Sequence, residues 1–317
     1  MTSGSGRPFA KMQAVGNDFV VVDATAWPPE TDWPPIALDL CDRHTGIGGD
    51  GLLVVLPSDV ADVRMRMFNP DGTEDMCGNG LRCVIRFARE RSWFTTDEGM
   101  AEAVDGLHQF SLRNADTTEP EGRIAVRMAE PCFAPEAIPR EVTPDTVGRS
   151  FSLTVTPDDI LVVTPVNTGS THTVIFVPTL PDNDTFFRIS PEIECHPLFP
   201  ERTSVLWTVV EHAGSATMPP RVRLRIWERG VGETLGCGTG ACAASVVSAL
   251  EGRINAFDSE ARRDRFRCDV VTAGGTLSTA FDREQSPNPD IAGFGPVTLI
   301  GPATVTFTGR LSEGIER

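Results

Sequence analysis

Two four-residue segments of the sequence place a cysteine immediately before a glycine-rich turn. They are Cys77-Gly78-Asn79-Gly80 and Cys237-Gly238-Thr239-Gly240. One such segment is weak evidence of function, because glycine beside cysteine also occurs by chance. Each copy, however, follows a stretch with strand periodicity and precedes a stretch that is typical of a helix. Two copies in matched surroundings indicate an internal duplication, with one unit in each of two domains.

The chemistry that these segments could perform depends on where their sulfur atoms lie. Glycines that lead into a helix leave backbone N–H groups available to an anion such as a carboxylate. A cysteine at the same helix end feels the positive end of the helix dipole, which favours the thiolate. Two such ends facing each other could hold one carboxylate, with a sulfur on each side of the adjacent carbon. One thiolate would remove the α-proton, and the opposite thiol would protonate the other face.

This two-base reaction develops negative charge on an enediolate intermediate. Fixed N–H dipoles in a site closed from water are one source of the stabilisation that it needs. The usual alternative is pyridoxal phosphate, which requires a lysine for its Schiff base. Lys11 is the only lysine in the sequence. The composition therefore favours a reaction without a cofactor.

Other interpretations of the cysteines remain open. A single buried cysteine before a helix is more often a packing residue, and Cys77 and Cys237 could also form a disulfide. Cys83 and Cys242 fall inside the following helical stretches and are interpreted as core residues. The eight cysteines form no CxxC pair and the five histidines are scattered, so neither a zinc site nor another metal site is expected.

Strand periodicity precedes both cysteine segments. In Val63–Asn69 and in Arg221–Glu228, apolar residues alternate largely with arginines, so one face of each strand should be buried. By this period of two, Asn69 and Glu228 share the apolar face of their strands. A buried carboxylate is costly unless it is paired or used, although either strand end could instead reach solvent. Asn69 and Glu228 are therefore candidate site residues.

The rest of the chain is expected to hold many strands and few helices, which is typical of an α+β fold. After the first cysteine segment, apolar residues recur at helical spacing from Leu81 to Ala88, with Arg82 on the opposite side. A further helix is expected around Pro35–Arg43. Strands are expected at Phe19–Val22, Leu52–Leu56, Arg123–Met128, Leu161–Val166, Thr173–Val177, Val205–Val210 and Thr304–Thr308. Segments Arg91–Glu121 and Pro178–Pro200, rich in Pro, Asp, Glu and Thr, are expected to be loops or insertions.

The composition of the 317-residue chain excludes several kinds of partner. Its formal net charge of −16 argues against nucleic acid and against a membrane surface, because clustered Lys and Arg bind both. The N-terminal residues do not resemble a signal peptide. No stretch approaches the roughly 18 apolar residues of a membrane span. A cytoplasmic protein that acts on a small molecule is expected.

Five segments together resemble the diaminopimelate epimerase family. They are Lys11–Phe19, Asp42–Gly48, Phe68–Gly72, Cys77–Cys83 and Glu228–Ala243. The resemblance implies an α+β fold of two pseudo-symmetric domains, each a curled, mostly antiparallel sheet around a central helix. It also implies an N-terminal domain of residues 1–122 plus 303–317 that carries Cys77. The C-terminal domain would comprise residues 123–302 and carry Cys237.

The same resemblance implies an isomerase that interconverts LL- and meso-diaminopimelate in lysine and peptidoglycan-precursor biosynthesis, without a bound cofactor. Cys77 and Cys237 would be the two bases, with Glu228 and His172 beside the thiols to bind the amino group and tune protonation. The reacting α-carboxylate would be bound by Gly78, Asn79, Gly238 and Thr239. Further substrate contacts would come from Asn17, Asn69 and Arg229. The forked donors of Arg229 suit the distal carboxylate.

Some positions depart from the family pattern. Ser170-Thr171-His172 stands where the family usually has Asn-Pro-His, and Thr203-Ser204-Val205 stands where it usually has Thr-Asn-Val. Ser170 and Ser204 would therefore bind the distal end of the substrate in place of asparagines. Serine is shorter, although it can still hydrogen-bond. Phe307 stands where some members place a tyrosine at a dimer contact, so the expected homodimer is also affected.

These departures leave alternatives open. One is a racemase of the same mechanism that acts on another amino acid, such as histidine. A second is an isomerase of the related phenazine-biosynthesis type, which lacks the paired cysteines. A third is a two-domain binding or redox-sensing protein without catalytic activity. The presence of both Cys77 and Cys237 counts against the second, and their placement in duplicated glycine turns counts against the third.

Overall fold

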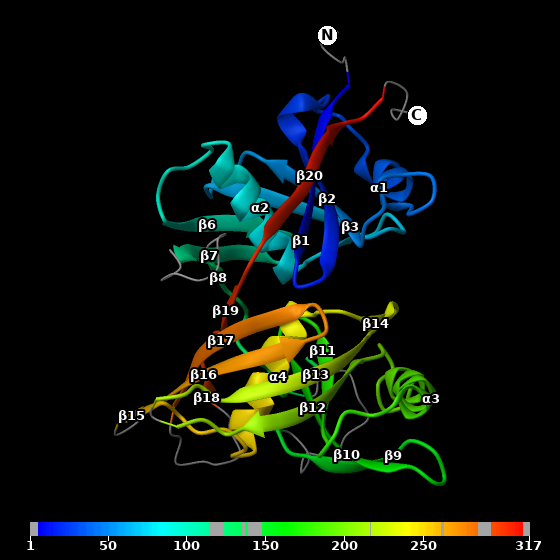
Figure 1. The fold of residues 1–317 in the computed structure, drawn as a ribbon, viewed down its shortest axis with the longest axis vertical. Helices are drawn as coiled ribbons and strands as arrows, with labels where there is room; N and C mark the ends of the chain where they lie inside the picture. Colours follow the sequence, from blue (N-terminus) through cyan, green and yellow to red (C-terminus); the bar gives the residue numbers. More distant parts are fainter. Residues whose placement is uncertain are drawn as a thin grey trace. The chain divides into compact units, whose positions relative to one another are not determined.

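The computed structural model describes residues 6–113, 123–134, 137–138, 148–215, 217–260, 263–284 and 293–312. The chain forms two compact units (Figure 1). The N-terminal unit comprises residues 1–127 and 300–317, and the C-terminal unit comprises residues 128–299. Strands predominate over helices in the described residues, so the predicted α+β class is confirmed. None of the described helices is long and apolar enough to cross a membrane.

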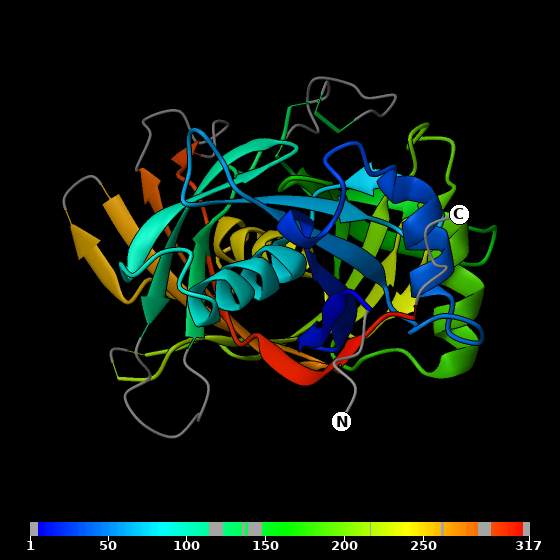
Figure 2. The same cartoon turned by 90° about the horizontal axis from the view of Figure 1, so that it is seen from above.

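The N-terminal unit is a mixed sheet around one central helix. Its strands are β1 (Pro8–Ala14), β2 (Asn17–Asp23), β3 (Gly51–Leu56), β4 (Val63–Phe68), β5 (Glu74–Asp75), β6 (Glu98–Ala103), β7 (Gly106–Arg113), β8 (Arg123–Arg127) and β20 (Thr304–Arg310). Its helices are η1 (Ala24–Ala26), α1 (Trp33–Cys41) and α2 (Gly78–Glu90). The strand order is β20-β1-β2-β3-β4-β6-β7-β8, with β5 on β4. Helix α2 contacts β1, β2, β3, β4, β6 and β8; Figure 2 shows it in cyan beside these strands.

The C-terminal unit repeats this plan around helix α4 (Gly238–Leu250). Its strands are β9 (Phe151–Thr154), β10 (Ile160–Asn167), β11 (Thr171–Phe176), β12 (Ser204–His212), β13 (Arg221–Glu228), β14 (Gly232–Thr234), β15 (Asp258–Glu260), β16 (Arg263–Thr272), β17 (Gly275–Glu284) and β18 (Gly293–Phe294). Its other helix is α3 (Asn183–Glu194), and β19 (Thr298–Gly301) spans the boundary between the units. The strand order is β9-β10-β11-β12-β13-β16-β17. Helix α4 contacts β10, β11, β12, β13, β16 and β17.

The two units share one order of connections. In the N-terminal unit, an antiparallel hairpin β1–β2 is followed by α1, by β3 parallel to β2, and by β4 antiparallel to β3. In the C-terminal unit, β10–β11, α3, β12 and β13 repeat these steps with the same strand directions. Short strands β5 and β14 then lead into α2 and α4. The duplication that the two cysteine segments indicate therefore extends from the first hairpin to the central helix of each unit.

Glycine lets each central helix approach its sheet closely. A Cβ atom on Gly80 would lie 2.8 Å from Leu53 Cδ2, and one on Gly240 would lie 3.1 Å from Leu206 Cδ2 and 3.2 Å from Cys237 Sγ. Such distances are shorter than ordinary contacts between carbon atoms. The second glycine of each CGxG segment therefore leaves room for a leucine of the sheet at the first helical turn, and Gly240 also leaves room for Cys237.

The apolar face predicted for α2 is buried, but one prediction about this helix is wrong. Leu81, Val84, Ile85 and Ala88 are all inaccessible to solvent, as the spacing predicts. Arg82, which was expected on the opposite, polar side, is also fully buried. A helix enclosed by a curled sheet has little solvent-facing surface, so a charged residue on its second turn is enclosed as well.

The strands and helices predicted from periodicity are found within a few residues of their expected bounds. The expected strands correspond to β2, β3, β8, β10, β11, β12 and β20, and the helix expected around Pro35–Arg43 is α1. Cys83 and Cys242 are inaccessible core residues, as predicted. The side chains of β4 and β13 alternate in burial over most of their length. The period of two therefore identified the buried faces of both strands.

The segment Pro178–Pro200 is not a loop, because most of it forms α3. The helix begins after Asp182, whose carboxylate accepts a hydrogen bond from the amide of Thr185 at 2.8 Å. Phe186, Ile189 and Ile193 recur at helical spacing and are buried in the core of the C-terminal unit. The many acidic and proline residues of the segment suggested a loop, but this apolar stripe and the N-cap decide its structure.

The segment Arg91–Glu121 was expected to be a loop or an insertion; it contains the hairpin β6–β7, so the loop interpretation is wrong. Ala103 pairs with Gly106 at the tight turn, where Gly106 has a φ of 130° that other residues rarely adopt. Ala101 and Phe110 are buried on the inner face, and the Phe110 ring lies 5.1 Å from that of Phe94. Residues 114–121 of this segment lie outside the described residues.

Candidate active site

Each central helix begins with a cysteine whose sulfur caps the helix. Cys77 Sγ accepts a hydrogen bond from Gly80 N at 3.4 Å, and Cys237 Sγ accepts one from Gly240 N at 3.3 Å. Both cysteines have the extended backbone that is usual at an N-cap. Cys77 is half-buried and Cys237 is buried. An N–H donor and a helix N-terminus both favour a negatively charged sulfur, so the two positions suit a thiolate.

Two buried cysteines away from the helix N-termini, Cys83 and Cys268, are held as neutral thiols. Burial raises the pKa of Cys83, which lies within α2, to about 12. Burial likewise raises the pKa of Cys268, on β16, to about 12. A thiol that ionises so reluctantly cannot serve as a base near neutral pH. Position at the helix N-terminus therefore distinguishes Cys77 and Cys237 from these core cysteines.

In the N-terminal unit, the structure brings together Asn17 and Asn79. Asn79, on the first turn of α2, is buried and donates through Nδ2 to Asn17 Oδ1. Asn17 opens β2 and donates in turn to Asp50 Oδ2 at 3.2 Å. Asn69 directly follows β4, is half-buried, and donates to Thr73 Oγ1 at 3.0 Å. None of the hydrogen bonds described for Asn69 links it to Asn17 or Asn79.

In the C-terminal unit, Cys237 belongs to a cluster of hydroxyl groups and an imidazole. Cys237 Sγ lies 3.3 Å from Thr239 Oγ1, and Thr239 Oγ1 lies 3.0 Å from His172 Nε2. Ser170 Oγ lies 3.0 Å from the same His172 nitrogen and 3.3 Å from Thr239 Oγ1. Four residues predicted for the site therefore lie within hydrogen-bond reach of one another. Gly238, also predicted, is buried at the start of α4 between Cys237 and Thr239.

His172 is neutral at ordinary pH because of its surroundings. It is 1% exposed. Burial, together with the nearby charge of Arg229, lowers its pKa from 6.5 to about 3. Its Nδ1 atom is buried and has no hydrogen-bond partner among the described residues. His172 therefore presents one polar edge, Nε2, and that edge faces the hydroxyl groups of Ser170 and Thr239.

Ser204, Glu228 and Arg229 lie at adjoining strand ends of the same unit. Ser204 opens β12, is paired with His172 of β11, and accepts from Arg229 N at 3.1 Å. Glu228 ends β13, and its Oε1 accepts from Thr234 Oγ1 at 2.5 Å. Arg229 is exposed, and its guanidinium donates to Glu201 O at 3.1 Å. The parallel pairing of β11 with β12 is what places Ser204 beside His172.

Glu194, at the end of α3, was missed by the sequence analysis. The residue is 4% exposed, and its carboxylate accepts from Gly230 N at 2.8 Å and from Trp227 Nε1 at 2.6 Å. It also forms an ion pair with Arg202. These contacts anchor the turn that follows Glu228 and carries Arg229. Glu194 is adjacent to Ile193, on the buried side of α3. The helical spacing of the apolar residues in α3 is the signal that could have identified Glu194 as a buried carboxylate.

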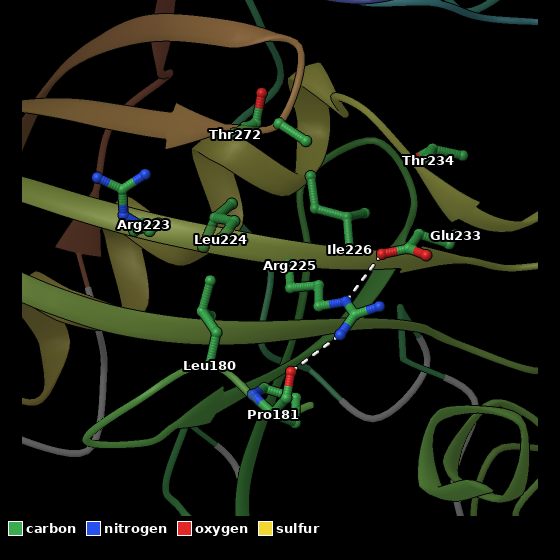
Figure 3. A pocket seen from close by; sticks show the side chains of 10 residues that line it. Leu180, Pro181, Arg223, Leu224, Arg225, Ile226, Glu233, Thr234 and Thr272 are labelled. Atoms are coloured by element: carbon green, nitrogen blue, oxygen red, sulfur yellow. Dashed lines mark hydrogen bonds and ion pairs between the residues drawn. The ribbon is translucent and has the colours of Figure 1, made fainter. Parts of the chain in front are cut away.

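A surface pocket lies elsewhere in the C-terminal unit (Figure 3). It measures about 370 Å³ and is lined by residues of β13, β14, the β16–β17 turn and the segment before α3. Arg225, at its centre, donates to Glu233 Oε1 at 2.8 Å, Pro181 O at 2.9 Å and Asn183 Oδ1 at 2.8 Å. These bonds use all three of its nitrogens. None of the predicted site residues lines this pocket, and Arg225 there joins β13 to the start of α3.

Two features bear on cofactors and metals. Lys11 is buried, forms an ion pair with Asp18 at 2.5 Å and donates to Gly48 O. The only lysine that could form a Schiff base is thus engaged in a structural contact. Within the described residues, His, Cys, Asp and Glu side chains form no group of three that could hold a metal ion.

Comparison with known proteins finds relatives over most of the chain. A family model described as diaminopimelate epimerase matches residues 9–133 and 164–300. Diaminopimelate epimerase of Heliobacterium modesticaldum is 37% identical over 306 residues, covering 96% of this chain and 99% of that protein. Diaminopimelate epimerase of Pelotomaculum thermopropionicum is 42% identical over 251 residues, covering 77% and 84%.

Solved structures with low sequence identity share the fold. A phenazine biosynthesis protein from Bacillus anthracis matches with a TM-score of 0.63 at 19% identity, covering 97% of this chain and 99% of that one. A hydroxyproline epimerase from Agrobacterium vitis matches with a TM-score of 0.63 at 13% identity, covering 100% and 96%. These likenesses establish the fold, and the sequence matches establish the narrower relationship: the chain belongs to the diaminopimelate epimerase family.

Proposed function

We propose that this protein is an isomerase that interconverts LL- and meso-diaminopimelate without a cofactor, in lysine and peptidoglycan-precursor biosynthesis. Family membership over nearly the whole chain supports the substrate. One observation carries the mechanism: each of two duplicated units places a cysteine sulfur against the N-terminal amides of its central helix. Duplicated thiols in equivalent surroundings are what a two-base inversion requires.

In the proposed reaction, Cys77 and Cys237 act on opposite faces of one α-carbon. One thiolate removes the α-proton and becomes a thiol, while the electron pair delocalises into the carboxylate as an enediolate. The other thiol then protonates the opposite face and becomes a thiolate. The backbone amides of Gly78, Asn79, Gly238 and Thr239 would bind the carboxylate as its charge grows, since preorganised donors stabilise developing charge.

The hydroxyl–imidazole cluster would set the protonation of Cys237. Thr239 Oγ1 lies between the sulfur and the neutral His172 ring, so the hydroxyl can donate to a thiolate and accept from a thiol. A charged imidazole would instead hold Cys237 as a thiolate and hinder its return to the thiol. We propose Glu228 and Arg229 as groups that bind the substrate's amino group and distal carboxylate, with Asn17, Asn69, Ser170 and Ser204 as further contacts.

A racemase of the same mechanism that acts on another amino acid is the second candidate. Ser170 Oγ lies within the cluster around His172, and Ser204 Oγ accepts from the backbone of Arg229. Both hydroxyl groups therefore have protein partners at positions where asparagines would reach further toward a substrate. A site that makes fewer contacts with the distal end of its substrate could accept a different amino acid.

Two further expectations stay predictions. We place the protein in the cytoplasm, where precursors of lysine and of peptidoglycan are made. We also propose a homodimer, and note that Phe307, on β20, is 48% exposed and packs edge-on against Phe9 at 6.1 Å between ring centroids. No partner other than the small-molecule substrate is proposed.

Hydrogen exchange at the α-carbon distinguishes the two candidate substrates. In deuterated water, incubation with LL-diaminopimelate should give deuterium at the α-carbon and conversion to the meso form. L-Histidine should exchange at least about 100-fold more slowly, because it lacks the second amino-acid group that Arg229 would bind. Mass spectrometry and chiral chromatography report both results. Exchange with histidine alone would assign the protein to the second candidate.

Alanine substitution tests the two bases. Cys77→Ala and Cys237→Ala should each lower epimerisation by a factor of about 10³ or more, because each removes a proton donor and acceptor from the reacting carbon. A serine at either position should retain slow exchange of one stereoisomer, since the opposite thiol survives. Cys195→Ala, which alters an exposed cysteine, is the control and should keep full activity. Wild-type turnover in either Cys77→Ala or Cys237→Ala would refute the assignment.

The neutral state of His172 can be tested through the pH dependence of stability. Its pKa of about 3 in the folded protein lies below the usual 6.5, so the unfolded chain binds a proton that the folded protein excludes. Stability should therefore fall as the pH drops below 6.5. Between pH 7 and pH 5, the wild type should lose about 2 kcal/mol more than a His172→Gln variant. Denaturant unfolding measures this difference, and equal losses would show that His172 is not held neutral.

A further inference from the structure

A run of hydrogen-bonded side chains in the N-terminal unit extends beyond the residues expected to bind substrate. It leads from Arg82 on α2 to Asn79, then to Asn17 on β2, and ends at Asp50 before β3. Only the two asparagines in the middle were predicted to belong to the site. The two charged residues at the ends have no role in the reaction described so far.

The chemistry of the two ends fixes the direction of every bond in the run. A guanidinium group can only donate, so the oxygen of Asn79 must face Arg82, whose Nη2 lies 2.6 Å from it. Asn79 then turns its NH₂ group toward the oxygen of Asn17. Asn17 donates to Asp50 Oδ2 at 3.2 Å, and a carboxylate can only accept. Rotating either amide by 180° would set two donors or two acceptors against each other.

Both ends are themselves held in place. Arg82 is fully buried and also donates to the backbone oxygens of Gly78 at 3.3 Å and Pro302 at 3.4 Å. Asp50 Oδ1 accepts from Arg43 Nη2 at 2.8 Å, and Asp50 Oδ2 also accepts from Asp18 N at 3.0 Å. A positive end and a negative end that are both fixed will polarise the bonds between them.

We propose that Arg82 and Asp50 are positioning residues that hold the amides of Asn79 and Asn17 in one orientation for an amino-acid substrate. This inference rests on the proposed function. An asparagine on a surface can present either its oxygen or its nitrogen to a ligand. Here the charged ends fix which atom of each amide faces which neighbour. Binding a substrate carboxylate or ammonium group therefore requires no reorientation of the amides.

The experiment compares substitutions that preserve the donor-to-acceptor direction of the hydrogen bonds from Arg82 to Asp50 with substitutions that remove it. Arg82→Lys keeps a charged group that can only donate, whereas Arg82→Gln is neutral and can also accept. Asp50→Asn keeps the shape of Asp50 but offers an NH₂ group that permits Asn17 to rotate. Arg86→Gln, one turn further along α2 at a residue that pairs with Glu90, is the matched control. KM and kcat for LL-diaminopimelate and the thermal midpoint are measured for each variant.

The expected result is that KM changes in the variants that remove the hydrogen-bond direction, whatever the thermal midpoint of each variant. Arg82→Gln and Asp50→Asn should each raise KM about tenfold, which corresponds to the loss of one well-placed hydrogen bond. Arg82→Lys should stay within about threefold of the wild type, and Arg86→Gln should match it. The double variant Arg82→Gln/Asp50→Asn should have a smaller effect than the product of the single ones, because both act on the same run.

Several outcomes would overturn the inference while leaving the proposed function in place. They are an unchanged KM in a folded Asp50→Asn variant, single effects that multiply in the double variant, and KM changes that track the thermal midpoint. If Arg82→Gln does not fold, Asp50→Asn alone decides, because Asp50 is 39% exposed and tolerates an isosteric change. Absence of turnover in the wild type would instead refute the proposed function itself.

Discussion

A sulfur atom at the first turn of an enclosed helix is the constraint on which the structure depends. Each sulfur accepts a hydrogen bond from the amide of the glycine three positions later, Gly80 after Cys77 and Gly240 after Cys237. At Gly240, a Cβ would lie 3.2 Å from that sulfur and 3.1 Å from the sheet. The curled sheet encloses the helix, the helix dipole favours the thiolate, and the glycine permits the contact between them.

Duplication gives the protein two equivalent sulfurs, and divergence gives them different neighbours. Beside Cys77, Asn79 belongs to a run that ends in the permanently charged Arg82 and in Asp50. Beside Cys237, Thr239 belongs to a neutral cluster with His172. The two thiols therefore share their position at a helix N-terminus and differ in the side chains around that position.

Periodicity in the sequence was enough to predict the class of fold, the buried faces of β4 and β13, and most of the strands. Periodicity gave wrong predictions where packing against distant parts of the chain, and not the local sequence, decides whether a residue is buried. Arg82 is charged and follows the first helical turn, so its position in the pattern predicts exposure to solvent. The surrounding sheet buries it instead. Glu194 was missed because its helix was taken for a loop. Residues that position other residues leave little trace in a single sequence, since their partners, such as Asp50 for Asn17, are distant along the chain.

The central claim is that two thiols, one in each unit, share the inversion, and the isotopic composition of early product tests it most directly. LL-diaminopimelate is incubated in deuterated water and sampled during the first few per cent of conversion. If two bases act, the meso product carries deuterium at the inverted carbon, while recovered LL-diaminopimelate remains unlabelled at the α-carbons. If a single base acts and its abstracted proton exchanges with solvent, the same deuterated thiol delivers its hydrogen to either face, so that label enters the recovered substrate as readily as the product. That second pattern would contradict the account.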